Sequence, residues 1–85
     1  MINETLTERG NRYGSFLDNA TLTQALTETM RLTNKWGALE ADQKEALEMI
    51  AHKISRILNG DPNYADSWHD IAGYATLVEN RLNEF

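Results

Sequence analysis

The chain has 85 residues, which is enough for one domain, and a domain this short buries a comparatively small fraction of its surface on folding. The absence of cysteine excludes a disulfide framework and a thiolate metal site, and a formal net charge of −5 argues against sequence-independent DNA binding. Hydrophobic residues make up 41% and charged residues 25%, as in folded globular domains. We therefore expect a single domain, residues 1–85, that compensates for its small core by forming a homo-oligomer.

The N-terminal sequence lacks the basic and apolar regions of a signal peptide, and no stretch approaches the roughly 20 apolar residues of a membrane-spanning helix. We expect a cytoplasmic protein that has no membrane partner.

Helical periodicity predicts three helices after a short N-terminal arm, and strand signals are weak. The first helix is expected after an Asp-Asn cap, and the second has the strongest apolar periodicity in the chain. The predicted bounds are 1–17 for the arm and 19–34, 41–58 and 65–83 for the helices.

The last two helices are separated by the turn signal Asn59-Gly60-Asp61-Pro62. Gly60 is expected to adopt a left-handed conformation after the helix, and Pro62 prevents the helix from continuing. Because a short connection makes neighbouring helices antiparallel, these helices should form a hairpin. The predicted fold class is all-α, a compact three-helix domain that self-associates.

Each helix of this hairpin carries polar residues beside its apolar face. Lys53 and Arg56 border the apolar face of one helix, and on the other helix the corresponding residues are Asp66, Asp70 and Tyr74. The two sets form either a salt-bridged helix pair or the lining of an anion-binding groove.

Two further residues of the last helix stand out. A glycine inside a helix, such as Gly73, lowers helix stability by about 1 kcal/mol relative to alanine. Its presence suggests that another group approaches the backbone there, and a closely packed helix is one alternative. Leu77 lies outside the main apolar face, so we expect it in a contact between chains.

The N-terminal segment ERGNRYG, residues 8–14, is the second concentration of polar chemistry. Arg9 and Arg12 can offer guanidinium groups to phosphate, and Tyr13 can offer a ring to a base. The alternative is a flexible, solvated turn. Phe16 and Leu17 favour the first interpretation, because we expect them to anchor the segment onto the helices.

A magnesium site is a further alternative, since hard cations are held by convergent oxygen ligands. Its candidate ligands would be Glu45, Glu48, Asp66 and Asp70. The helix phase favours a surface pair between Glu45 and Arg56 instead, so no metal site and no catalytic residue is predicted. His52 is expected to be solvated.

Residues 8–14, 43–56, 60–62 and 66–75 together resemble a family of small bacteriophage and prophage proteins of uncharacterised function. The hairpin is more distantly similar to the MazG-type all-α nucleotide pyrophosphatases, which hold magnesium with a Glu-x-x-Glu and a Glu-x-x-Asp motif. Glu45 and Glu48 match the first motif, whereas two aspartates four residues apart replace the second. The resemblance therefore implies nucleotide binding more than catalysis.

We expect a protein that binds a linear or cyclic nucleotide at a helix or subunit interface. Phosphates would be held by Arg9, Arg12, Lys53 and Arg56. Bases would stack on Tyr13 and Tyr74, and ribose hydroxyls or base amines would donate to Asp66 and Asp70. The phage resemblance suggests a sponge that sequesters a nucleotide second messenger of anti-phage defence.

Two alternatives remain open. One is a Mg²⁺-dependent nucleotide pyrophosphatase that uses the four carboxylates of the magnesium alternative. The other is a protein that inhibits a host factor by binding it with its acidic surface.

Overall fold

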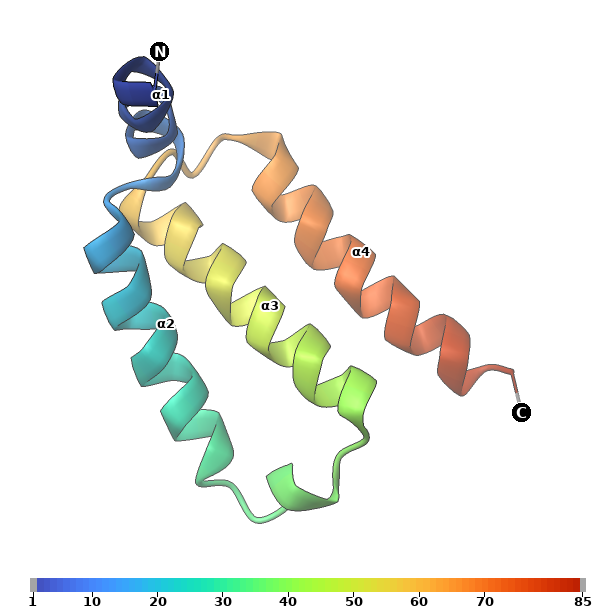
Figure 1. Cartoon of the computed structure of the whole chain (residues 1–85). Coiled ribbons are helices and arrows are strands. Elements are labelled where there is room, and N and C mark those ends of the chain that lie inside the picture. The colour runs from blue at the N-terminus through green and yellow to red at the C-terminus, as the bar shows by residue number, and fades with distance from the viewer. Residues whose placement is uncertain (1, 85) are drawn as a thin grey trace.

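The computed structural model describes residues 2–84, apart from the side chain of Glu4, so the predicted domain extends one residue beyond this range at each end. The described residues form four α-helices and a short 3-10 helix and contain no strand (Figure 1). Their bounds are α1 Ile2–Tyr13, α2 Phe16–Arg31, η1 Trp36–Ala38, α3 Ala41–Asn59 and α4 Ala65–Leu82. The predicted all-α class is confirmed.

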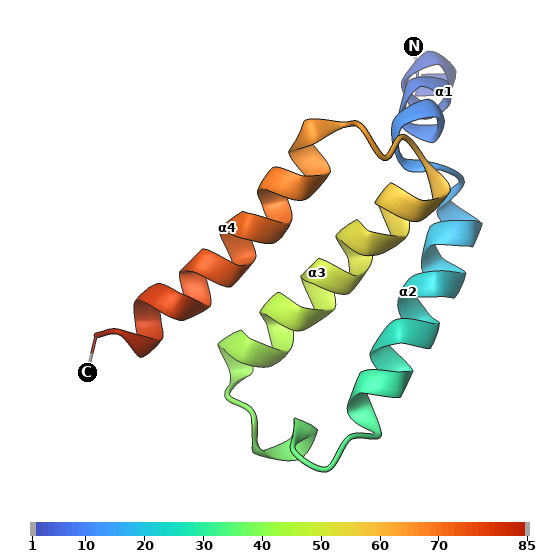
Figure 2. The same ribbon diagram turned by 180° about the vertical axis from the view of Figure 1, so that it is seen from behind.

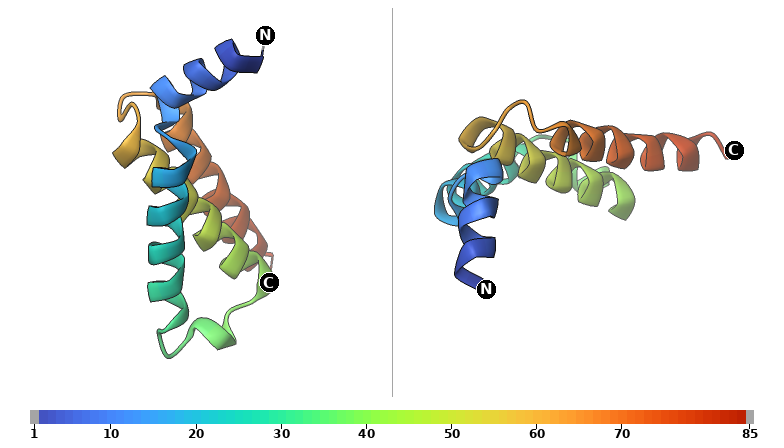
Figure 3. Two further views of the ribbon diagram at one scale, coloured as in Figure 1. Left: turned by 60° about the vertical axis from the view of Figure 1, so that its left-hand side comes forward. Right: turned by 90° about the horizontal axis from the view of Figure 1, so that it is seen from above.

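Helices α2, α3 and α4 form a single layer in which α3 lies in the middle and packs against both neighbours (Figures 1 and 2). The predicted antiparallel hairpin corresponds to α3 and α4. Helix α1 projects out of this layer at one end (Figure 3). Because the helices lie side by side, they do not close around a central core.

The dimensions reflect this open arrangement. The principal extents are 47 × 27 × 22 Å, and the radius of gyration is 14.7 Å, against about 12 Å for a compact domain of this length. Only Ala46, Ala51 and Ile57 are buried apolar residues among those described. The chain thus leaves much of its apolar surface uncovered.

Polar contacts connect the helices of the layer. Between α2 and α3, Thr23 donates its hydroxyl hydrogen to Ser55 Oγ at 2.8 Å, and Ser55 is fully buried. Between α3 and α4, Arg81 donates two hydrogen bonds to Asp42, which lowers the pKa of that carboxyl. These contacts fix how the helices pair even though few apolar side chains are buried between them.

The N-terminal arm, for which no helix was predicted, is helical over residues 2–13. Gly14 separates this helix from α2 with a left-handed φ of 81°, a conformation that favours glycine. Helix α2 then begins three residues earlier than predicted, and its cap is Ser15, whose Oγ accepts a hydrogen bond from the backbone N–H of Asp18. The helix also ends earlier, at Arg31.

The bounds of α3 and α4 differ from the prediction by one residue each, at the C-terminal end. The left-handed conformation predicted for Gly60 is wrong, since its φ is −122°. No helix in the described part of the chain is long and apolar enough to cross a membrane.

Candidate functional site

Two turns cross at one end of the layer, where the α1–α2 turn meets the α3–α4 turn. A Cβ atom on Gly60 would collide with the carbonyl oxygen of Arg12, and one on Gly14 would collide with the carbonyl oxygen of Asn59. The backbone N–H of Asp61 donates to the Arg12 carbonyl oxygen at 2.8 Å. Gly60 is therefore required by the close approach of two backbones.

Two asparagines connect the crossing to the layer. Asn19, which is buried, donates from Nδ2 to the carbonyl oxygen of Tyr13 at 2.6 Å. Its Oδ1 accepts a hydrogen bond from Asn59 Nδ2 at 3.2 Å. Through Asn19, the end of α1 is held against both α2 and α3.

Arginine and tyrosine side chains gather around this crossing. The guanidinium carbons of Arg9 and Arg56 lie 5.1 and 4.5 Å from the centroid of the Tyr13 ring. Tyr13 meets Tyr64 edge to face at 5.8 Å, and Arg12 lies 5.2 Å from the centroid of the Tyr64 ring. Contacts of this kind between a guanidinium and a ring are attractive and orient both groups. The structure thus brings the predicted Arg9, Arg12, Tyr13 and Arg56 together.

A cavity of about 370 Å³ lies between α1, the start of α2 and the end of α3. We call it the arginine cleft and define it by Leu6, Arg9, Ser15, Phe16, Asn19 and Arg56. Among the side chains that the structure describes, neither Arg9 nor Arg56 forms an ion pair. Two positive charges without a carboxylate partner in this set therefore line one cavity.

The start of α2 adds to the positive potential of the cleft. The N-terminus of a helix carries a partial positive charge that favours anions within the first turn. Ser15 uses its Oγ as an acceptor for the cap, so its hydroxyl hydrogen remains able to donate to a ligand. The cleft can offer an anion two guanidinium groups and a hydroxyl donor.

A larger hollow of about 540 Å³ runs along α4 beside Gly73, Tyr74 and Leu77. Its lining contains no arginine or lysine. A Cβ on Gly73 would meet nothing within 4 Å, so no packed helix explains this glycine within the described chain. Tyr74 lies along this hollow and not in the arginine cleft.

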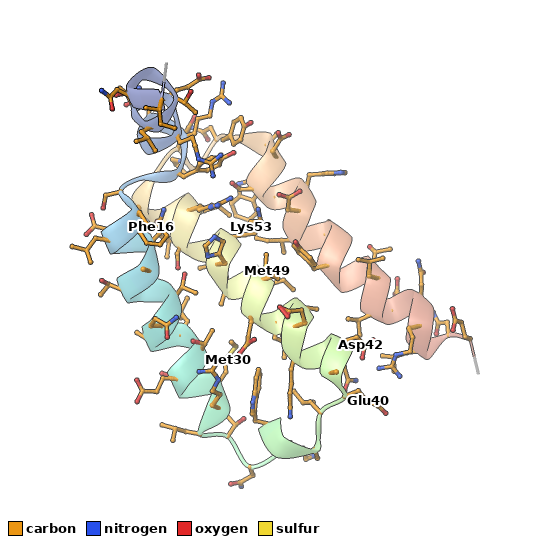
Figure 4. The ribbon with its side chains drawn as sticks, in the orientation of Figure 1. Phe16, Met30, Glu40, Asp42, Met49 and Lys53 are labelled. Carbon is orange, nitrogen blue, oxygen red and sulfur yellow. The ribbon has the colours of Figure 1, made fainter. Side chains whose placement is uncertain are left out.

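Other predicted ligand residues are engaged in contacts of their own. Lys53, with 12% of its side chain exposed, points between α3 and α4 and lies 2.9 Å from Asp70 (Figure 4). The hydrogen bond from Lys53 lowers the pKa of the Asp70 carboxyl. Arg12 pairs with Glu8 at 2.7 Å. Of the two alternatives predicted for Lys53, a salt bridge between helices and an anion-binding groove, the structure shows the salt bridge.

Asp66 accepts a hydrogen bond from the hydroxyl of Tyr64 at 3.0 Å. This bond, together with burial and the negative charge of Asp66, raises the pKa of Tyr64. Tyr64 was not among the predicted site residues, although its position directly after the Pro62 turn could have indicated it. Phe16, Ser15 and Asn19 were also missed as cleft residues.

The expectation that Phe16 and Leu17 anchor the N-terminal segment is wrong. Phe16 is 84% exposed and Leu17 is 73% exposed. Phe16 stands at the end of the layer from which α1 projects (Figure 4). Phe16 instead lines the arginine cleft.

The carboxylates of the magnesium alternative do not converge. Glu48 pairs with Arg31 across α2 and α3, and Asp70 pairs with Lys53. Among the described side chains, no group of three or more histidine, aspartate or glutamate residues could share a metal ion. The expected pair of Glu45 and Arg56 is wrong, because eleven residues along one helix separate them by about 16 Å.

His52 is half-buried one turn before Arg56, which differs from the solvated position predicted for it. Burial lowers its pKa, and the positive charges of Arg56 and Lys53 lower it further. As the pH falls below the ordinary value of about 6.5, the unfolded chain therefore binds this proton before the folded chain does. The contribution of His52 to stability is present above that pH and is lost as the pH falls through the lowered folded-state pKa.

We expect the free energy of unfolding to decrease between about pH 7 and pH 5.5 in the unaltered protein, and to decrease less in His52→Gln. Urea unfolding at both values measures this difference. The ion pairs with Arg81 and Lys53 lower the pKa of Asp42 and Asp70, so these two carboxyl groups do not contribute to the change in stability between pH 7 and pH 5.5. An identical decrease in both proteins would show that His52 does not carry the pH dependence.

The comparisons with known proteins identify one family. The model of the family described as "Domain of unknown function (DUF6378)" matches residues 2–82, which is nearly the whole chain. The chain belongs to this family. Neither the curated proteins nor the solved structures gave a match. The boundaries of this DUF6378 domain include all four α-helices and every residue of the arginine cleft.

Proposed function

We propose that this DUF6378 protein binds a phosphorylated nucleotide in the arginine cleft. The observation that supports this most is the pair Arg9 and Arg56, which come from different helices, line one cavity and have no carboxylate partner among the described side chains. Guanidinium groups are well suited to phosphate, because their planar donors match its oxygens in pairs. Tyr13 contacts both guanidinium groups and so limits their freedom before a ligand arrives.

Within this proposal the phosphate contacts Arg9, Arg56 and the hydroxyl of Ser15. The base contacts Phe16, whose exposed ring lines the same cavity, and not Tyr13, whose ring already contacts two arginines and Tyr64. Lys53, Asp66 and Asp70 then act as structural residues that hold α4 and the turn before it. The proposed ligand-binding set is accordingly narrower than the predicted one.

The dimensions of the cleft agree with a ligand the size of a mononucleotide. Small-molecule sites typically enclose about 300–1,000 Å³, and the cleft encloses about 370 Å³. Leu6 and Phe16 supply an apolar portion, whereas the arginines, Ser15 and Asn19 supply polar groups. This combination favours a ligand with a charged part and a planar, apolar part.

The positions of the candidate carboxylates favour nucleotide binding without hydrolysis. A magnesium-dependent pyrophosphatase needs several acidic side chains around its metal ions, and three of the four candidates here are engaged separately with Arg31, Lys53 and Tyr64. A protein that retains a nucleotide intact can act as a sponge for a nucleotide signal. The phage setting suggested by the sequence resemblance is one context in which such sequestration would be useful.

Retention and turnover can be separated directly. The purified protein is incubated with a panel of linear and cyclic nucleotides, with and without Mg²⁺, and the nucleotide released on denaturation is analysed by mass spectrometry. We expect bound nucleotide to be recovered unchanged under both conditions. Pyrophosphate release that requires Mg²⁺ and disappears in Glu48→Gln would instead establish the pyrophosphatase alternative.

A further inference from the structure

One face of the helix layer is apolar and uncovered. At about 100° per residue, Leu47, Ile54 and Leu58 lie on the same face of α3. This face lies between the side of α3 that contacts α2 through Ser55 and the side that contacts α4 through Lys53. Leu47 is 40% exposed and Leu58 is 68% exposed, so neither is covered within the chain.

The apolar surface continues across α4. Ala75 lines a hollow of about 320 Å³ together with Leu47 and Ile50 of α3. Trp68 and Leu82, each seven residues from Ala75 and so on the same side of α4, are 56% and 49% exposed. We call this surface the apolar face and define it by Leu47, Ile50, Ile54, Leu58, Trp68, Ala75 and Leu82.

Helix α1 does not cover the apolar face. It contacts α3 through Arg56, which lies on the side of α3 opposite Leu47 and Ile54. The views agree that α1 projects from one side of the layer only, which leaves the other side open (Figures 2 and 3). The arginine cleft and the apolar face are therefore on opposite sides of α3.

The amount of excess surface can be compared with what a stable interface needs. The accessible surface is 6205 Å², about 1,100 Å² more than a compact monomer of 9.7 kDa would expose. Because the projecting α1 contributes to this excess, about 2,200 Å² is the upper bound of what two copies could bury in total, and this bound lies in the range of obligate homodimers. A second copy of the chain is thus large enough to bury the apolar face.

We propose that a second copy of this chain packs on the apolar face and forms a dimer of two helix layers. The residues that define the face are apolar, and by the same helix phase Glu79 is the charged residue of α4 that lies beside Ala75 and Leu82. The chain buries few apolar residues by itself, and a copy of itself is the partner that is present at the same concentration whenever it folds. The packing of two flat layers places apolar surface on apolar surface without disturbing α1.

This proposal is independent of nucleotide binding, and it differs from the contact predicted at Leu77. Leu77 is 66% exposed, but it lies beside Gly73 on the side of α4 away from Ala75. Leu77→Asp and Leu58→Asp are consequently a matched pair, because each places one carboxylate at an exposed leucine on a different surface.

Analytical ultracentrifugation of the unaltered protein and both variants tests the proposal. We expect the unaltered protein to be a dimer at micromolar concentration. In Leu58→Asp the dissociation constant should rise by roughly a hundredfold or more, because an unpaired charge would be buried in the interface. Leu77→Asp should leave it unchanged. A monomeric unaltered protein, dissociation by Leu77→Asp alone, or an effect of neither variant would overturn the proposal.

A second measurement covers the case in which Leu58→Asp does not fold. Because the chain contains no cysteine, Leu58→Cys and Leu77→Cys each introduce a single thiol. We expect a maleimide to react slowly with the thiol of Leu58→Cys at high protein concentration and faster on dilution, while Leu77→Cys reacts equally at both. Equal reactivity of Leu58→Cys at all concentrations would show that the apolar face is open in solution.

Discussion

Replacing Arg56 with methionine is expected to weaken nucleotide binding by roughly ten- to a hundredfold, because one charge-assisted contact to phosphate contributes about 1.5–3 kcal/mol. The fold should survive, since Arg56 forms no ion pair among the described residues and loses only its contact with the Tyr13 ring. Isothermal titration calorimetry with linear and cyclic nucleotides measures the affinity. Thermal unfolding of the ligand-free protein measures the stability.

Arg31→Met is the matched control for this experiment. It removes the same charge from the same molecule, but Arg31 pairs with Glu48 and is not part of the arginine cleft. We expect its nucleotide affinity to equal that of the unaltered protein. If Arg56→Met also binds with unchanged affinity, Arg56 is a structural residue of the turn crossing and the ligand lies elsewhere.

Replacing Gly60 with alanine is expected to destabilise the turn crossing strongly, with a cost of about 3 kcal/mol or more. The added methyl group would meet the Arg12 carbonyl and the Tyr13 backbone, and backbone atoms cannot move aside as a side chain can. The same alanine substitution at Gly73 should have the opposite sign. Gly73 lies in a helix with nothing near its Cβ position, so Gly73→Ala should stabilise by about 0.5–1 kcal/mol.

Urea unfolding of the two glycine variants beside the unaltered protein measures both effects at once. Both residues are glycines of the same hairpin, but Gly60 lies in the turn against another backbone and Gly73 lies inside a helix with open space beside it. A Gly60→Ala protein as stable as the unaltered one would mean that the two turns do not pack as closely as the geometry describes. A destabilised Gly73→Ala protein would indicate that another chain occupies that surface.

The hairpin was predictable from local sequence because its signals are local. The apolar periodicity of α3 and the Pro62 turn fix the ends of the two helices within a residue. The conformation of Gly60 was not predictable in the same way. Glycine is required at this position because the backbone of Arg12 and Tyr13 lies against it. These residues are distant in sequence, so the residues around Gly60 do not indicate the contact.

The N-terminal segment illustrates the same limit. Gly14 separates α1 from α2, and its left-handed φ depends on how α1 leaves the layer. The apolar periodicity of the sequence does not show this separation, so it predicted an arm in place of α1. The residue types of Arg9, Arg12 and Tyr13 singled out this segment, because it combines cations with an aromatic ring. The partners of that cluster, Arg56 and Tyr64, depend on long-range packing.

The structure was also needed to decide which of the predicted site residues have a structural role and which line the cavity. Lys53 and Arg56 occupy similar positions in the helix pattern, yet one lies against Asp70 and the other lies against Tyr13 beside a cavity. Helix phase gives the direction of a side chain but not the identity of what it meets. The exposure of Phe16, expected to be an anchor, has the same origin, because nothing in its own segment shows that the layer ends there.

The most direct test of the proposed site is a map of where nucleotide contacts the protein in solution. NMR spectra that resolve the arginine Nε–H groups, the backbone amides and the aromatic ring C–H groups are recorded as a mononucleotide and, separately, inorganic pyrophosphate are added. We predict that both ligands shift the signals of Arg9, Arg56 and Ser15, and that only the nucleotide shifts the ring signals of Phe16. Shifts confined to the hollow beside Tyr74 and Leu77, or no shifts at millimolar nucleotide, would contradict the proposal that the arginine cleft binds a phosphorylated nucleotide.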